Sequence, residues 1–287
     1  MVAPVVLRRM AERRSAIAVG YVFALLGTVF GSWAARLADV KERIDASPGP
    51  LGAAMLCTAI GSLTSMAVAP RLIRRFGVRR VAMTGATGCC VGVTVAASAP
   101  SLGVLAASLL VLGMCSGATS IGLGMQAVAF ERRANRPIVN RFHGCHSAGG
   151  LVGALAGAAA STWLNPTVHL IAIAAAGLAG LVVVRSWFPT GDVSAAVASG
   201  STAVVNRRFL AASSLAWCAA FGEGTVVAWA AVHLREELGA PPALAAFGFA
   251  AMAAVIVTAR AVGPAVLGRW PARTVLSRSG WLARGDP

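Results

Sequence analysis

The sequence predicts an all-α protein that crosses a membrane about eight times. Hydrophobic residues make up 57% of the 287 residues and charged residues only 12%, which is about half the charged fraction of a soluble domain. Several stretches without any Asp, Glu, Lys or Arg reach the roughly 20 residues that a helix needs to cross a bilayer. These stretches are continuously apolar and do not alternate, which favours helices over the strands of a membrane barrel.

Each predicted span follows from one of these stretches. The two longest are expected to divide into two spans each, at Ser98–Ser101 and at Asn165-Pro166, where proline and small polar residues favour turns. The first stretch is too long for the apolar core of a signal peptide, and further spans follow it. In chain order, the spans lie in Ser15–Ala35, Ala46–Pro70, Val81–Phe130 (two), Phe142–Val184 (two), Phe209–Leu234 and Leu238–Ala259.

The net charge of +15 is distributed unevenly between the two ends of these spans. If the N-terminus is cytoplasmic, most arginines lie in short loops on that side, and the opposite side carries a balanced set of charges. The positive-inside rule then predicts that both termini are cytoplasmic. Because the basic clusters lie between spans, nucleic-acid binding is not expected. The balanced set comprises Arg36, Lys41, Arg43 and Arg235 with Asp39, Glu42, Asp45, Glu236 and Glu237.

A polar segment divides the chain into two parts. It is the one long cytoplasmic loop, and we expect an N-terminal six-helix bundle over 1–185, a linker over 186–208 and the start of a second bundle over 209–287. An internal repeat supports this division, because Val68–Val81 and Val262–Val275 share proline, arginine and valine positions in register.

Parallel six-helix repeats around a central pathway resemble the major facilitator superfamily of transporters. The most specific element is the loop after the second helix, where that family tends to show G-x-x-x-D-R-x-G-R-R. This chain has Pro70 for the glycine and Arg74 for the acid that ordinarily helps to lock the cytoplasmic gate. Arg75, Gly77 and Arg79 fall in register with the pattern, whereas Val78 stands at the first of its two final arginines and Arg80 follows one position later; the resemblance implies a gating role for Arg75, Gly77, Arg79 and Arg80.

The chain is also similar to a poorly characterised bacterial branch of that family. The resemblance implies a multi-pass protein of the bacterial plasma (inner) membrane, without a cofactor. It depends on Gln126, Glu131-Arg132, Phe142-His143-Gly144, Ser147, Gly149-Gly150, Glu223-Gly224, Trp229, Arg260 and Gly263.

Two functions remain open at this point, because a member of the family has two six-helix halves and this chain offers eight spans. The first is a secondary transporter that moves a small solute by alternating access with proton coupling. The second is a C-terminally truncated fragment that inserts into the bilayer but transports nothing. A homo-oligomer that completes the second bundle in trans is a further arrangement. The expected partners are a small solute, protons and the lipid bilayer.

Glu223 is the first candidate for a functional residue. It lies near the middle of the seventh predicted span, where a lipid-exposed carboxylate costs at least ~2.5–3.5 kcal/mol. We expect it to face protein or water, or to be protonated, which suits a proton-binding or substrate-binding group. Gly222 and Gly224 weaken the helix around it. The alternative is a buried carboxyl group paired with Gln126 or Arg260.

Other polar and aromatic residues within the spans have two interpretations each. Arg260 either extends to the cytoplasmic interface or pairs with a carboxylate or an anionic substrate. Gln126 either bonds to another helix or contacts substrate. Trp33 and Trp229 either anchor the helices at the interface or line an outer vestibule.

Glu131, His143 and His146 form a candidate polar cluster at the cytoplasmic side. The two histidines are three residues apart at the start of the fifth helix, so they share a helical face near Glu131. Such a cluster either clamps the loop or admits protons.

Motifs for other chemistry are missing from the sequence. The sequence has no C-x-x-C pair, and no third ligand lies at a suitable spacing from the two histidines, so no metal site is predicted. The sequence lacks a phosphate-binding loop, so an ATP-driven pump is not predicted. It also lacks a nucleophile elbow, so an enzyme of that type is not predicted. Glycines spaced four apart instead predict close helix contacts at Gly27–Gly31, Gly113–Gly117 and Gly149–Gly153–Gly157.

Overall fold

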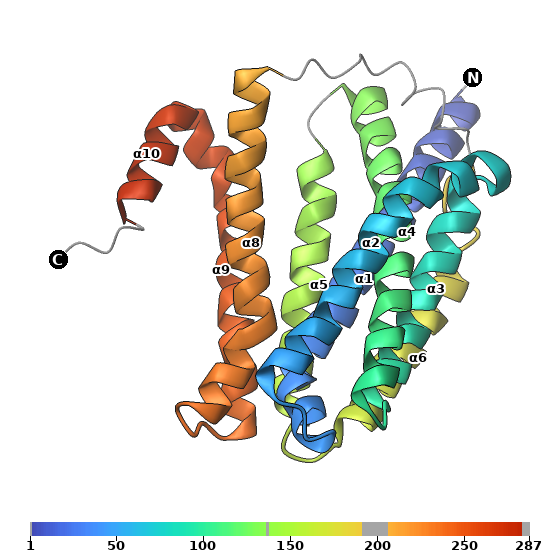
Figure 1. Cartoon of the computed structure of the whole chain (residues 1–287). Coiled ribbons are helices and arrows are strands. Elements are labelled where there is room, and N and C mark those ends of the chain that lie inside the picture. The colour runs from blue at the N-terminus through green and yellow to red at the C-terminus, as the bar shows by residue number, and fades with distance from the viewer. Residues whose placement is uncertain (1, 136–137, 191–205, 283–287) are drawn as a thin grey trace.

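The computed structural model describes the chain except for residues 1, 136–137, 191–205 and 283–287 (Figure 1). The described residues form nine helices and no strands. The predicted linker 186–208 lies largely outside them, so the division into 1–185 and 209–287 stays a prediction. The helices are α1 (Val2–Arg43), α2 (Pro48–Phe76), α3 (Val78–Ala97), α4 (Leu102–Ala134), α5 (Val139–Ala160), α6 (Pro166–Val184), α8 (Arg207–Glu236), α9 (Pro242–Arg269) and α10 (Ala272–Leu282).

Both predicted breaks within the long apolar stretches are confirmed. The break between α3 and α4 ends at Ser101, whose hydroxyl accepts a hydrogen bond from the Val104 amide at 3.5 Å. The break between α5 and α6 ends at Asn165, whose side-chain oxygen accepts from the Val168 amide at 2.8 Å. Pro166 follows at the first helical position. An N–H group there has no partner within the helix, so the proline costs no hydrogen bond.

Several helices extend further than the sequence predicts, among them α9, which was expected to end at Ala259 and continues to Arg269. The second span was expected to end at Pro70, but α2 continues to Phe76 with this proline inside it, as membrane helices tolerate. The chain turns at Gly77, whose φ of 82° favours glycine and whose amide donates to the Ile73 carbonyl at 2.8 Å. Likewise α1 continues to Arg43, so the charged residues after Ala35 are helical.

Six helices are long and apolar enough to cross a membrane, and α8 is a seventh if its two segments count as one span. Those segments, Phe209–Val226 and Trp229–Glu236, meet at a bend of 41°. The bend therefore follows Val226 and does not lie at the glycines around Glu223. The eighth predicted span is α5, whose first turns carry Arg141, His143 and His146 and which packs against both α1 and α9.

Glycines allow the closest contacts within the bundle of α1 to α6. A side-chain carbon at Gly27 or Gly31 of α1 would overlap carbonyl oxygens of α5, and one at Gly149 or Gly153 would overlap carbonyl oxygens of α1. A side chain at Gly113 of α4 would overlap a carbonyl oxygen of α2 in the same way. The predicted packing role of these glycines is confirmed, since small residues let the helix backbones approach.

Two further helices, α8 and α9, stand beside this bundle (Figure 1). α9 packs mainly on α5, and α8 packs on α9 and α1. The side of α8 and α9 that faces the bundle therefore meets α1 and α5. This is the arrangement that positions the candidate site.

We predict that Gly153→Ala destabilises the protein and that Gly124→Ala does not. At Gly153 the added carbon would meet the Thr28 carbonyl, whereas at Gly124 of α4 it meets nothing within 4 Å. Overpacking of this kind costs about 1–3 kcal/mol, and alanine otherwise favours a helix by up to about 1 kcal/mol. Thermal unfolding of both variants in the same detergent measures the difference. Equal unfolding midpoints would contradict the packing role of the α1–α5 contact.

Candidate functional site

A cavity of about 600 Å³ lies between α1, α2 and α8, next to α4. Its lining is apolar and aromatic, with a few hydroxyl groups, and its volume is typical of a site for a small molecule. Its lining includes Phe30, Trp33 and Leu37 of α1, Thr58 and Ser62 of α2, and Phe221, Thr225 and Trp229 of α8.

Both candidate tryptophans line this cavity. Trp33 is only 6% exposed, and the ring of Trp229 lies against the start of α2, where a side-chain carbon at Gly52 would be 3.4 Å from its Cζ2 atom. Both tryptophans therefore lie against a space between helices, and their role as interfacial anchors or as the lining of an outer vestibule stays a prediction.

Glu223 lies in a smaller cavity of about 200 Å³ between α1, α5, α8 and α9. His146 and Ser147 of α5 line the same cavity, and Phe30 borders both this cavity and the larger one. Among the described residues, the Glu223 carboxylate has no hydrogen-bond or ion-pair partner, and the residue is exposed. Neither Gln126 nor Arg260 pairs with it. An unpaired carboxylate therefore faces the space between the two parts of the chain.

Arg260 connects α9 to α5 beside this cavity. Its guanidinium donates to the Ser147 hydroxyl at 2.7 Å and to the His143 carbonyl at 3.0 Å. It binds no carboxylate among the described residues. Its positive charge is consequently held next to the cavity that Glu223 lines.

Glu131 lies apart from the other two residues of the predicted polar cluster, whereas His143 and His146 both lie near Arg260. The Glu131 carboxylate accepts hydrogen bonds from the amides of Ile138 and Val139 at 2.9 and 3.0 Å, where it satisfies the start of α5. The His143 ring packs edge-on against Phe23 at 5.3 Å between centroids. Only His146 reaches a cavity, and it shares that cavity with Glu223.

Gln126 lies outside both cavities. It is fully buried in α4, and neither atom of its side-chain amide has a hydrogen-bond partner among the described residues. A buried amide without a partner is rare, because leaving it unsatisfied costs about 1–3 kcal/mol.

Ion pairs join α1 to α8 at the arginine-poor end of the bundle. Asp39 of α1 pairs with Arg36 at 2.7 Å and also with Arg235 of α8. Arg235 in turn donates to Glu42 at 2.6 Å, and Lys41 pairs with Glu236. We call these six residues the α1–α8 clasp.

The clasp is partly shielded from water. Arg36 is 2% exposed and also donates to the Leu164 carbonyl at 2.6 Å, and Lys41 is 8% exposed. The clasp lies within about two helical turns of Leu37 and Trp229, which line the larger cavity. Its charges were recognised in the sequence only as a balanced set. The signal for pairing was that opposite charges lie at the ends of two helices on the same side.

The residues matched to the family gating loop lie at the opposite, arginine-rich end. Gly77 forms the turn between α2 and α3, and the Arg75 guanidinium stacks over the Phe76 ring at 5.3 Å. Arg79 is half-buried and Arg80 is exposed. Among the residues that the structure describes, no group of three or more His, Cys, Asp or Glu side chains is placed to hold a metal ion.

Proteins of similar sequence include membrane transporters. An uncharacterised transporter of Sinorhizobium fredii is 29% identical over 96% of this chain and 74% of its own length. An uncharacterised MFS-type transporter of Yersinia pestis is 28% identical over 86% of this chain and 65% of its own length. The membrane protein MosC of Rhizobium meliloti is 25% identical over 93% and 65%. The chain thus spans about two thirds to three quarters of the length of these relatives.

The fold is similar to that of a solved transporter. The crystal structure of the nucleoside transporter NupG superposes with a TM-score of 0.63, at 13% identity, over 93% of this chain and 67% of that one. The family model described as Major Facilitator Superfamily matches residues 15–282. The chain therefore belongs to the Major Facilitator Superfamily, a family of membrane transporters and not of enzymes.

Proposed function

We propose that the protein moves a small solute by alternating access through the cavity between α1, α2 and α8, and that Glu223 is its proton-binding or substrate-binding carboxylate. The observation that carries this proposal is the unpaired Glu223 side chain at a cavity between the two parts of the chain. Asp39, Glu42 and Glu236 lie instead at helix ends, within the clasp.

Protonation of this carboxylate offers a physical link between proton binding and conformational change. An ionised carboxylate at membrane depth needs water or a cation beside it. A protonated one can be enclosed by apolar neighbours such as Phe30, Ala253 and Ile256, which line the same cavity. A conformation that closes around Glu223 is therefore favoured when a proton or a cationic substrate is bound.

Alternating access also requires contacts that close one end of the solute pathway, and the clasp supplies such contacts. It joins α1 and α8 at one end of the larger cavity, and the positive-inside rule puts that end outside the cell. We infer that this conformation is closed to the outside. Opening must break the pairs between Arg235 and the two carboxylates of α1, so their strength sets part of the balance between the two conformations.

We predict that Glu223→Gln abolishes proton-coupled transport. Amide and carboxylate have nearly the same shape, but the amide does not bind a proton. The measurement is dye-reported proton movement in everted membrane vesicles, on addition of a panel of sugars, organic acids and amphiphilic cations. We expect a solute that elicits a response with the wild-type chain to elicit less than about a tenth of it with Glu223→Gln.

Glu237→Gln is the matched control, because Glu237 is an exposed acid at the end of the same helix without a described partner. It should keep the wild-type response. A Glu223→Gln protein that moves protons as the wild type does would refute the assigned role. A wild-type chain that is inert toward the whole panel would refute transport by this polypeptide.

We predict that Arg235→Gln loosens the closed end of the cavity. The change removes the pairs to Asp39 and Glu42, which are partly exposed and therefore each contribute modestly. Hydrogen exchange in lipid nanodiscs should be faster, by roughly threefold to tenfold, in peptides that cover the end of α1 and the end of α8. Arg207→Gln, at the other end of α8, should leave these peptides unchanged. Identical exchange in the two variants would show that the clasp does not hold α1 to α8.

A further inference from the structure

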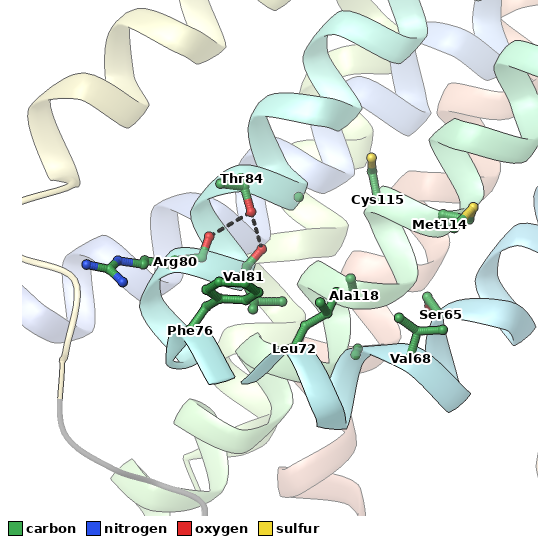
Figure 2. A pocket seen from close by; sticks show the side chains of 12 residues that line it. Ser65, Val68, Leu72, Phe76, Arg80, Val81, Thr84, Met114, Cys115 and Ala118 are labelled. Carbon is green, nitrogen blue, oxygen red and sulfur yellow. Dashed lines mark hydrogen bonds between the residues drawn. The ribbon is translucent and has the colours of Figure 1, made fainter. Parts of the chain in front are cut away.

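A groove of about 520 Å³ lies between the C-terminal half of α2 and the N-terminal half of α3, with α4 as its floor (Figure 2). We call it the α2–α3 groove. It is separate from the two cavities of the candidate site, with which it shares no lining residue. Leu72 and Phe76 line it from α2, Val81 from α3, and Met114, Cys115 and Ala118 from α4.

The groove offers almost no hydrogen bonds to a ligand. The Ser65 hydroxyl donates to the Ser62 carbonyl at 2.7 Å, within its own helix. The Thr84 hydroxyl donates to the Arg80 carbonyl at 2.8 Å, as the dashed lines of Figure 2 show. A polar solute would lose its hydration here without replacement. The lining of the groove therefore favours a hydrocarbon ligand.

The mouth of the groove, in contrast, is cationic. Arg80 lines it, and its guanidinium makes no ion pair or hydrogen bond with any described residue. The Arg75 guanidinium stacks over Phe76, which lines the same mouth. The segment Arg71–Arg80 carries five arginines and no acidic residue, since Arg74 stands where the family pattern has an acid. A complementary negative charge must therefore come from outside this segment.

An apolar slot under a cationic rim matches a phospholipid in shape and charge. The helices that form the groove, α2, α3 and α4, all qualify as membrane spans by length and composition, so we expect the surface that they leave uncovered to meet lipid chains. Basic residues at the ends of such helices attract anionic headgroups, and long arginine side chains can reach the headgroup region. A diacyl lipid supplies both parts at once, whereas a free anion would leave the slot unfilled.

We propose that the α2–α3 groove binds one anionic phospholipid, with an acyl chain between α2 and α3 and its phosphate at Arg80. This site is independent of the solute pathway proposed above. It also ties the turn at Gly77, where the family pattern places the gating loop, to the lipid composition of the membrane.

Native mass spectrometry of the whole chain tests the headgroup. The probes are dioleoyl phosphatidylglycerol and dioleoyl phosphatidylcholine, which have the same acyl chains and differ in charge. We expect one phosphatidylglycerol to be retained in preference to phosphatidylcholine, and Arg80→Gln to weaken its binding about fivefold. Arg74→Gln is the matched control, because it removes the same charge from the same turn at a residue that does not line the groove.

Photo-crosslinking tests the position of the acyl chain. Phosphatidylglycerol with a diazirine in its chain should label the peptide that contains Met114, Cys115 and Ala118, and unlabelled phosphatidylglycerol should compete more strongly than phosphatidylcholine. Three results would each overturn the proposal: equal retention of the two lipids, equal weakening by Arg74→Gln and Arg80→Gln, or labels spread evenly over the helices. The last would mean ordinary annular lipid, or a groove covered by another segment or a second copy.

Discussion

The close approach of α1 and α5 is the contact on which the rest of the structure depends. In hydrocarbon, helices gain little from burying apolar surface against one another, so their association relies on close packing at small residues. Gly27 and Gly31 lie against the backbone of His146 and Gly150, and Gly149 and Gly153 lie against the carbonyls of Ala24 and Thr28. The same stretch of α1 carries Phe30, and the same stretch of α5 carries His146 and Ser147. Glycine packing thereby fixes the backbone from which the smaller cavity is built.

The two ends of the molecule use charge in different ways. At the arginine-poor end, acidic and basic residues are present together and pair across α1 and α8. At the arginine-rich end, the turn between α2 and α3 has only positive charge and no described acid beside it. One end is therefore held by ion pairs within the protein, whereas the turn at the other end leaves its positive charge available to the phospholipid proposed above. Between them lies the unpaired carboxylate of Glu223, which neither end neutralises.

Features determined by local sequence were predictable, as were the close helix contacts at glycines spaced four apart, whereas features that depend on the identity of the neighbouring helix were not. The breaks at Ser98–Ser101 and Asn165-Pro166 follow from turn and capping residues within a few positions. The extension of α2 through Pro70 depends on neighbouring helices, which a single sequence does not reveal. For the site, hydropathy alone singled out Glu223. That His146 shares its cavity, while Glu131 and His143 face elsewhere, depends on which face of α5 is turned toward that cavity, and a single sequence does not reveal this.

The central claim is that α1 and α8 exchange between two arrangements, and that the protonation of Glu223 biases the exchange. The most direct measurement is the distance between spin labels at positions 47 and 237, beyond the clasp, by pulsed electron paramagnetic resonance in nanodiscs. The account predicts two distance populations whose ratio changes as the pH is lowered, and a ratio that no longer depends on pH in Glu223→Gln. A single distance that is the same at every pH and in both proteins would contradict it.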